Sequence, residues 1–209
     1  MQQEYKSGFV TLIGRSNVGK STLVNAMVGE KVAIVSDRPQ TTRNQIRGVL
    51  HRPDYQIVFI DTPGLHRPHN RLGQFMVRSA GAALEDVDVV LAVMDASVPV
   101  GGGDRAVMDR LATLKRTPVI LVLNKIDLVP KTSLLKTMDL FREYEFITEI
   151  VPISARTFEG VDLLEQLIAA HLTPGPRYFP EEMYTDQPER VIVAEIIREK
   201  ALSLLRDEI

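Results

Sequence analysis

Residues Gly14–Ser21, with the sequence GRSNVGKS, constrain the fold of this chain more than any other segment. They match the pattern G-x-x-x-x-G-K-[ST], in which glycines let the backbone wrap so that its N–H groups point at phosphate oxygens. An apolar run over Gly8–Ile13 precedes the loop, and a helical pattern over Lys20–Val28 follows it. This order of strand, loop and helix predicts a phosphate-binding loop in an α/β fold.

Two side chains of this loop have predicted roles. We expect the Lys20 ammonium to reach the β- and γ-phosphates of a nucleotide, and the Ser21 hydroxyl to ligate Mg²⁺. The residues expected to line the nucleotide here are Gly14, Arg15, Ser16, Asn17, Val18, Gly19, Lys20, Ser21 and Thr22.

Up to about residue 172, short apolar runs alternate with amphipathic segments, which indicates a mostly parallel sheet covered by helices. The predicted strands are Gly8–Ile13, Gln45–Arg52, Gln56–Ile60, Val87–Met94, Val119–Asn124 and Ile147–Ile153. The predicted helices are Lys20–Val28, Arg71–Leu84, Asp104–Leu114, Ser133–Tyr144 and Val161–Leu172. We expect the second and third strands to form an antiparallel hairpin at one edge. The fold class is therefore α/β, with three α/β/α layers and a six-stranded, mostly parallel sheet.

The pattern changes near residue 173. Residues 173–188 are rich in proline and acidic side chains, so we expect a linker there. Residues 189–209 follow as an amphipathic helix, which either packs back on the first domain (1–172) or opens a second domain. We favour the second alternative, because the sequence stops inside the helix without a capping residue.

Composition narrows the class of protein. With 44% hydrophobic residues, 25% charged residues and a net charge of −2, the chain resembles a globular protein and predicts no broad basic surface. It has no cysteine, which excludes disulfides and thiolate metal sites. Its longest apolar runs are far shorter than the roughly 20 residues that span a bilayer.

A second motif, DTPG at residues 61–64, follows a predicted strand. A carboxylate there can hold Mg²⁺ through water, and the Gly64 N–H can sense a γ-phosphate. The expected nucleotide contacts of this segment are Asp61, Thr62, Pro63, Gly64 and Leu65. Leu65 stands where many GTPases place the glutamine that orients the attacking water. An aliphatic side chain cannot orient water, so hydrolysis has to use another group.

A third motif selects the base. It consists of Asn124, Lys125, Ile126 and Asp127. The Asp127 carboxylate can accept hydrogen bonds from the N1–H and the exocyclic amine of guanine, a pair of donors that adenine lacks. We expect Asn124 to tie this loop to the phosphate loop, and the Lys125 stem to cover the base. A last segment, Ser154, Ala155 and Arg156, completes the set, because the Ala155 N–H could donate to guanine O6.

In this order, the motifs resemble the translation-factor-related branch of P-loop GTPases from Gly8 to about Leu172. The segment PQTTR at residues 39–43, together with DTPGLH at residues 61–66, resembles more closely the Era family, bacterial GTPases that bind ribosomal RNA during small-subunit assembly. The tail over residues 189–209 is similar to the opening helix of the α+β KH domain that ends Era proteins. Ser16 departs from the proline common in the family, at a position that supplies no ligand.

The resemblance implies a switch that binds and hydrolyses GTP with Mg²⁺. It makes Thr42 the threonine that ligates the metal only when the γ-phosphate is present, so the expected metal ligands are Ser21, Thr42 and Asp61. In related GTPases with asparagine at the place of Asn17, this side chain helps to hold K⁺ beside the phosphates. We therefore hypothesise stimulation by K⁺. The expected catalytic residues are Lys20, Thr42, Gly64 and Asn17.

The resemblance also implies partners: GTP and GDP, and small-subunit ribosomal RNA and the 30S subunit, the latter mainly through residues beyond 209. It also implies a place in the cytoplasm, with peripheral contact at the cytoplasmic face of the membrane as a further expectation. We expect a monomer, although the sequence itself leaves the oligomeric state open. From Thr173 onward there are five Arg and Lys against eight Asp and Glu, so we expect this chain to bind RNA weakly. Two alternatives stay open: another Era-like GTPase, acting in large-subunit assembly or tRNA modification, and a nucleotide-gated RNA-binding adaptor with vestigial hydrolysis.

Overall fold

The computed structural model describes residues 4–33, 46–61, 87–114 and 116–204. Within these ranges it does not describe the side chains of Ile46, Arg47, Asp61, Leu202 and Ser203. The helix predicted over Arg71–Leu84 lies outside the described residues. None of the helices within them is long and apolar enough to cross a membrane.

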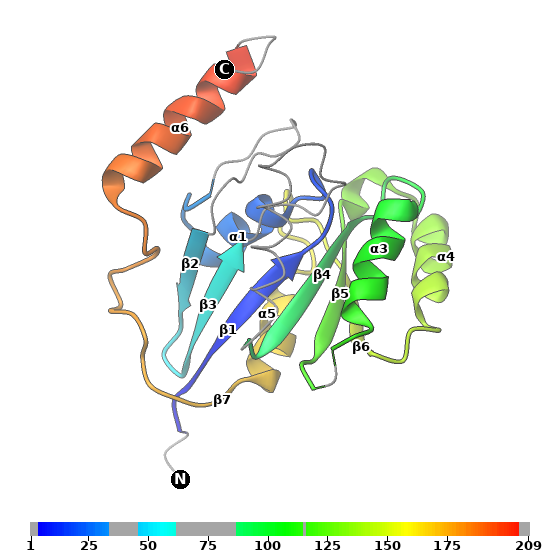
Figure 1. Cartoon of the computed structure of the whole chain (residues 1–209), viewed down its shortest axis with the longest axis horizontal. Helices are drawn as coiled ribbons and strands as arrows, with labels where there is room; N and C mark the ends of the chain where they lie inside the picture. The colour runs from blue at the N-terminus through cyan, green and yellow to red at the C-terminus, as the bar shows by residue number, and fades with distance from the viewer. Residues whose placement is uncertain (1–3, 34–45, 62–86, 115, 205–209) are drawn as a thin grey trace.

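The described residues form one sheet, in which six strands follow the order β2-β3-β1-β4-β5-β6 (Figure 1). The strand bounds are β1 Lys6–Ile13, β2 Ile46–His51, β3 Tyr55–Asp61, β4 Val89–Asp95, β5 Val119–Asn124 and β6 Ile147–Pro152. All neighbours pair in parallel except β2 and β3, which form the predicted antiparallel hairpin with β2 at the edge. A seventh strand, β7 (Thr173–Pro174), is only two residues long and pairs antiparallel with β1. The predicted α/β architecture is confirmed.

Two hydrophobic clusters cover the two faces of the sheet, because successive side chains of each strand point to opposite faces. One cluster joins the sheet to α1 (Lys20–Val28) and α5 (Val161–His171). The other joins it to α3 (Gly102–Leu111) and α4 (Lys131–Phe141), which lie on the same side of the sheet in Figure 1. The helix α1 has its predicted bounds, and the other three start and end within three residues of theirs.

The central strands β4 and β5 position the polar residues that follow them. Every residue of β5 is buried, and so is every residue of β4 except Asp95. Continuous apolar runs of this kind are typical of parallel strands that are covered by helices on both faces. The strands end in register at polar residues, with Asp95 beside Asn124. Both therefore lie at the carboxyl edge of the sheet, where ligands bind in open α/β folds.

Residues 173–188, predicted as a linker, run along the sheet in the structure, and we call this segment the strap. After β7, the backbone N–H groups of Tyr178 and Phe179 donate to Oε1 of Gln56, at 2.9 and 3.1 Å. The Gln56 Nε2 donates to the carbonyl oxygen of Phe179 at 2.9 Å. Gln56 is fully buried, so the strap meets the start of β3 through a protected set of hydrogen bonds.

The strap continues along the edge strand β2. The Val49 N–H donates to the carbonyl oxygen of Tyr184 at 2.9 Å, and Thr185 forms an antiparallel bridge with Gly48. An exposed strand edge offers such unpaired backbone groups, and the strap covers part of it here. The composition of the segment is that of a linker, but its backbone is docked on the sheet.

The last described helix, α6 (Glu189–Leu204), lies beyond the β2 edge of the sheet (Figure 1). Lys31 Nζ forms a salt bridge with Glu199 at 2.7 Å, and Ile192 and Ile196 face the segment after α1 across a small cavity. Among the α6 side chains that the structure describes, three large apolar ones are exposed, namely Val193, Ile197 and Leu204. The helix thus combines features of both alternatives, and its place in a KH-like domain stays a prediction.

Candidate nucleotide-binding site

The loop between β1 and α1 lies against the ends of β4 and β5. A Cβ atom at Gly14 would lie 2.2 Å from the carbonyl oxygen of Val93, and a Cβ atom at Gly19 would lie 2.2 Å from Asn124 Nδ2. Gly19 also has a φ of 96°, in the left-handed region that favours glycine. Asn17 has a φ of 63°, which asparagine tolerates better than most residues. The two glycines therefore allow the backbone approach that a phosphate-binding loop requires.

The Lys20 ammonium is held inside this loop. Lys20 is only 6% exposed, and its Nζ donates to the carbonyl oxygens of Gly14 at 3.2 Å and Arg15 at 2.8 Å. Ser21 follows it as the second residue of α1 and is half-buried. The cation thus lies against the backbone of the phosphate loop, and its contact with the β- and γ-phosphates stays a prediction.

The Arg15 side chain does not face the loop interior. Its guanidinium forms a salt bridge with Asp104 at 3.3 Å, at the start of α3. Asp104 is buried and also accepts a hydrogen bond from the Gly101 N–H at 2.9 Å. Arg15 can therefore serve a nucleotide only through its backbone. Val18 is similar, because its side chain is buried in the hydrophobic core.

Asn124 joins three loops. It is 2% exposed, and its Nδ2 donates to the carbonyl oxygen of Val18 at 2.9 Å. Its Oδ1 accepts hydrogen bonds from the N–H groups of Lys125 at 2.8 Å and Ala155 at 3.0 Å. The predicted tie between the base loop and the phosphate loop is present. The Ala155 N–H was expected to donate to guanine O6, but here it donates to Asn124, so a contact with O6 would have to share or replace this bond.

Lys125 crosses from the base loop to the phosphate loop. Its backbone has a φ of 67°, and its Nζ donates to the carbonyl oxygen of Asn17 at 2.8 Å. The same Nζ forms a salt bridge with Asp95 at 2.6 Å. Sequence reasoning missed Asp95. Its position at the end of a buried strand, in register with Asn124, is the one signal that could have indicated it.

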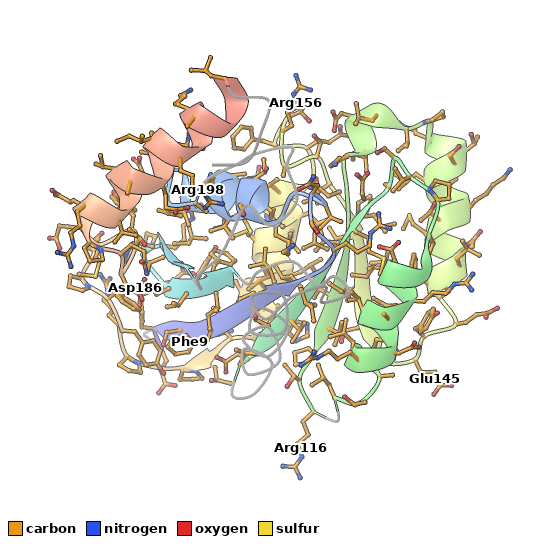
Figure 2. The ribbon with its side chains drawn as sticks, turned by 45° about the horizontal axis from the view of Figure 1, so that its top comes forward. Phe9, Arg116, Glu145, Arg156, Asp186 and Arg198 are labelled. Carbon is orange, nitrogen blue, oxygen red and sulfur yellow. The ribbon has the colours of Figure 1, made fainter. Side chains whose placement is uncertain are left out.

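The third loop is held by its own hydrogen bonds. Ser154 is fully buried, and its Oγ accepts a hydrogen bond from the Thr157 N–H at 3.1 Å. Gly160 has a φ of 75°, and a Cβ atom there would lie 2.5 Å from the carbonyl oxygen of Pro152. Arg156 is exposed, and Figure 2 shows its side chain pointing away from the body of the protein.

A cavity of about 400 Å³ lies where these loops meet. It is lined by Gly19, Thr22, Asn124, Lys125, Asp127, Leu128, Ser154, Ala155 and Arg156. Its volume falls in the range of small-molecule sites, roughly 300–1,000 Å³. Residues more than a hundred positions apart in sequence thus form one pocket, and Asp127 is part of its wall.

The second motif is described only in part. Asp61 ends β3 and pairs in register with Leu12 of β1, which places its backbone at the same edge as the phosphate loop. Residues 62–65 and Thr42 lie outside the described residues, as does the Asp61 side chain. The predicted roles of Asp61, Thr42 and Gly64 therefore stay predictions.

Comparison with known proteins agrees with this geometry. The family model described as 50S ribosome-binding GTPase matches residues 9–125. A curated relative, the GTPase Era of Alkaliphilus metalliredigens, is 52% identical over 205 residues, covering 98% of this chain and 69% of the relative.

Two solved structures are also similar. One is Era in complex with MgGDPNP and nucleotides 1506–1542 of 16S ribosomal RNA, with a TM-score of 0.92, 41% identity, and coverage of 98% of this chain and 70% of that one. The other is a variant of Aquifex aeolicus Era bound to GDP and AlF4⁻, with a TM-score of 0.91, 41% identity, and coverage of 98% and 69%.

Proposed function

The chain belongs to the Era family of GTPases, and we propose that it is a GTP-hydrolysing switch that binds small-subunit ribosomal RNA and assists assembly of the 30S subunit. The observation that carries the proposal is the cavity of about 400 Å³, in which the phosphate loop, the base loop and the Ser154–Arg156 loop converge. We infer that this cavity takes the guanine and ribose of the nucleotide, and that the loop before α1 takes its phosphates.

The carboxylate of Asp127 would give the pocket its preference for guanine. It lines the cavity and can accept two hydrogen bonds from one edge of the guanine base. Adenine presents no such pair of donors and would leave the charged acceptor unpaired, at a cost of about 3 kcal/mol or more. These hydrogen bonds act only over a short distance, so Asp127 has to be held in place. Asn124 provides this by fixing the base loop to both neighbouring loops.

The phosphates would be held by the backbone N–H groups of the loop and by Lys20. The Lys20 ammonium now donates to two carbonyl oxygens of the same loop, so phosphate oxygens can replace these acceptors without a large movement. A buried ammonium interacts more strongly with phosphate than an exposed one, because water screens it less.

Of the proposed Mg²⁺ ligands, the structure describes the Ser21 side chain and the backbone of Asp61. Ser21 offers a half-buried hydroxyl next to Lys20, and the backbone of Asp61 reaches the same edge of the sheet. Mg²⁺ prefers oxygen ligands and usually takes only one or two from carboxylates, with the rest from phosphates and water. When bound, the ion would neutralise charge on the phosphate oxygens. We therefore keep Ser21, Thr42 and Asp61 as its proposed ligands.

Leu65 occupies the position of the glutamine that orients the attacking water in many GTPases, so hydrolysis in this chain has to use other groups, among them a cation that stabilises charge on the phosphates. We propose that Asn17 helps to hold K⁺ beside the phosphates. Its exposure and its φ of 63° support this, since the left-handed backbone presents the residue at the surface of the loop. Rates of GTP turnover in K⁺ and in Na⁺ buffers of equal ionic strength test the idea. Equal rates would exclude it.

Single-turnover hydrolysis of GTP, with and without 30S subunits, tests the main proposal. A switch should hydrolyse bound GTP slowly alone, and the 30S subunit should change that rate. A nucleotide-gated adaptor would bind GTP with the same affinity and would not convert it over hours. Stimulation by 50S subunits or tRNA instead of 30S subunits would favour the other Era-like functions.

The RNA contact is proposed from the likeness to the complex with 16S ribosomal RNA. Residues 173–209 carry more acidic than basic side chains, so they offer little attraction for a phosphate backbone. We therefore expect this chain to bind the matching segment of 16S RNA weakly, with a dissociation constant in the micromolar range or above at physiological salt. Tight and specific binding would contradict this part of the proposal.

A further inference from the structure

Asp95 is a charged residue at the end of a strand whose other residues are all buried. Its side chain is only 10% exposed. One carboxylate oxygen, Oδ1, accepts hydrogen bonds from the backbone N–H and the hydroxyl of Ser97. The other, Oδ2, accepts a hydrogen bond from Lys125 Nζ at 2.6 Å. Both oxygens are therefore engaged, and the charge faces the base loop.

The carboxylate is negatively charged near neutral pH. Burial acts to raise the pKa of Asp95, and hydrogen bonds from Lys125 and Ser97 outweigh it, so the pKa is lowered overall. A short hydrogen bond between two charged groups is about twice as strong as one between neutral groups. Because the pair is largely protected from solvent, it is screened less than a surface ion pair.

Lys125 needs such support, because its backbone is in an unfavourable conformation. A left-handed residue other than glycine costs about 1–3 kcal/mol, and the surrounding structure has to over-determine it. The lysine has the freedom of four rotatable side-chain bonds, so a single acceptor in the phosphate loop, the Asn17 carbonyl at 2.8 Å, would hold it loosely. Asp95 supplies the second, charged acceptor from a rigid central strand.

We propose that Asp95 is a positioning residue for guanine nucleotides: it fixes the Lys125 side chain as a wall of the base pocket and so links that wall to Asn17 of the phosphate loop. The inference rests on the proposed nucleotide site. Asp95 itself does not line the cavity, whereas Lys125 does. Its effect on binding should therefore pass through Lys125.

This role predicts a pattern that a purely structural role would not give. In Asp95→Asn, the Lys125 ammonium loses its charged partner, and we expect GDP and GTP to bind about tenfold more weakly, which corresponds to about 1.4 kcal/mol. The KM for GTP should rise by a similar factor, while kcat at saturating GTP stays within about twofold, as expected when an interaction contributes equally to the ground state and the transition state.

A double-mutant cycle with Lys125→Met tests the route of the effect. When Lys125 is already absent, Asp95→Asn should change the GDP dissociation constant by less than about twofold. The same tenfold loss in both backgrounds would overturn the proposal, and so would wild-type affinity in Asp95→Asn alone. Asp95→Glu, which keeps the charge, should retain more affinity than Asp95→Asn.

Two controls distinguish the loss of the Asp95–Lys125 contact from a general effect of a removed charge and from a loss of folding. Asp139→Asn removes one partner of an ion pair with Arg142, in which the Arg142 side chain is 71% exposed and the Asp139 side chain 64% exposed. It should leave GDP binding unchanged. The thermal midpoint of each variant without nucleotide shows whether it is folded. If Asp95→Asn does not fold, Asp95→Ala takes its place in the same cycle, because it also removes the charged partner of Lys125. If the wild-type chain binds neither GDP nor GTP, the proposed function itself fails.

Discussion

Asn124 donates its side-chain Nδ2 to the carbonyl oxygen of Val18 over 2.9 Å, across 106 positions of sequence. The same side chain accepts hydrogen bonds from the N–H groups of Lys125 and Ala155, so Asn124→Ala would leave three groups without their partner. Each such loss in a buried site costs about 1–3 kcal/mol. We expect the free energy of unfolding in urea at pH 7 to fall by at least about 3 kcal/mol, and GDP to bind at least tenfold more weakly. Unchanged GDP affinity would show that the three loops do not depend on this residue.

Two glycines with similar backbone conformations allow a matched test of the phosphate loop. Gly19 has a φ of 96° and Gly29, after α1, has a φ of 80°. An alanine at Gly19 would place its Cβ 2.2 Å from Asn124 Nδ2, whereas at Gly29 nothing lies within 4 Å. Both substitutions cost about 1–2 kcal/mol in backbone energy. Only Gly19→Ala should lower GDP affinity, by at least about 100-fold. Calorimetric titration of both variants with GDP measures this, and an equal loss of affinity in the two would contradict the prediction.

The environment of Tyr55 predicts how the free energy of unfolding changes at alkaline pH. Burial, and then the hydrogen bond that its hydroxyl donates to Glu165 at 2.6 Å, raise the pKa of Tyr55 above the ordinary value of 10.0. Above pH 10, the tyrosine ionises in the unfolded chain before it ionises in the folded protein, so the free energy of unfolding decreases as the pH rises. Tyr55→Phe should cost about 1 kcal/mol at pH 7 and show a weaker decrease between pH 10 and 11. Parallel pH profiles of the two proteins would contradict this.

Gln56 should hold the strap on the sheet. Its amide makes three hydrogen bonds with the backbone of Tyr178 and Phe179 in a fully buried position. Gln56→Met keeps the size and flexibility of the side chain and leaves these backbone groups unpaired. We expect it to lower the free energy of unfolding by about 2–3 kcal/mol and to speed proteolytic cleavage within residues 173–188. Gln166→Met, on the exposed side of α5, is the control and should change neither.

The elements that sequence predicts best are those with a strong local signal. The nearly continuous apolar runs of β4 and β5 and the phosphate loop before α1 are of this kind, and their bounds differ from prediction by two residues at most. The sequence predicts the strap as a linker, whereas its backbone is docked on the sheet. Composition reports its prolines and acidic side chains but not the backbone groups that Gln56 binds. The ion pair between Asp95 and Lys125 depends on strand order and register, which no local pattern contains.

Base selection by Asp127 tests the central claim most directly. Xanthine carries a carbonyl where guanine carries its exocyclic amine, so an amide side chain can pair with xanthine as the carboxylate pairs with guanine. Dissociation constants of GDP, ADP and XDP should be measured for the wild-type chain and Asp127→Asn. We predict that the wild type binds GDP and discriminates against ADP by at least about 100-fold, and that Asp127→Asn loses GDP and gains XDP. Comparable binding of GDP and ADP by the wild type, or retention of GDP by Asp127→Asn, would contradict the assignment of this pocket.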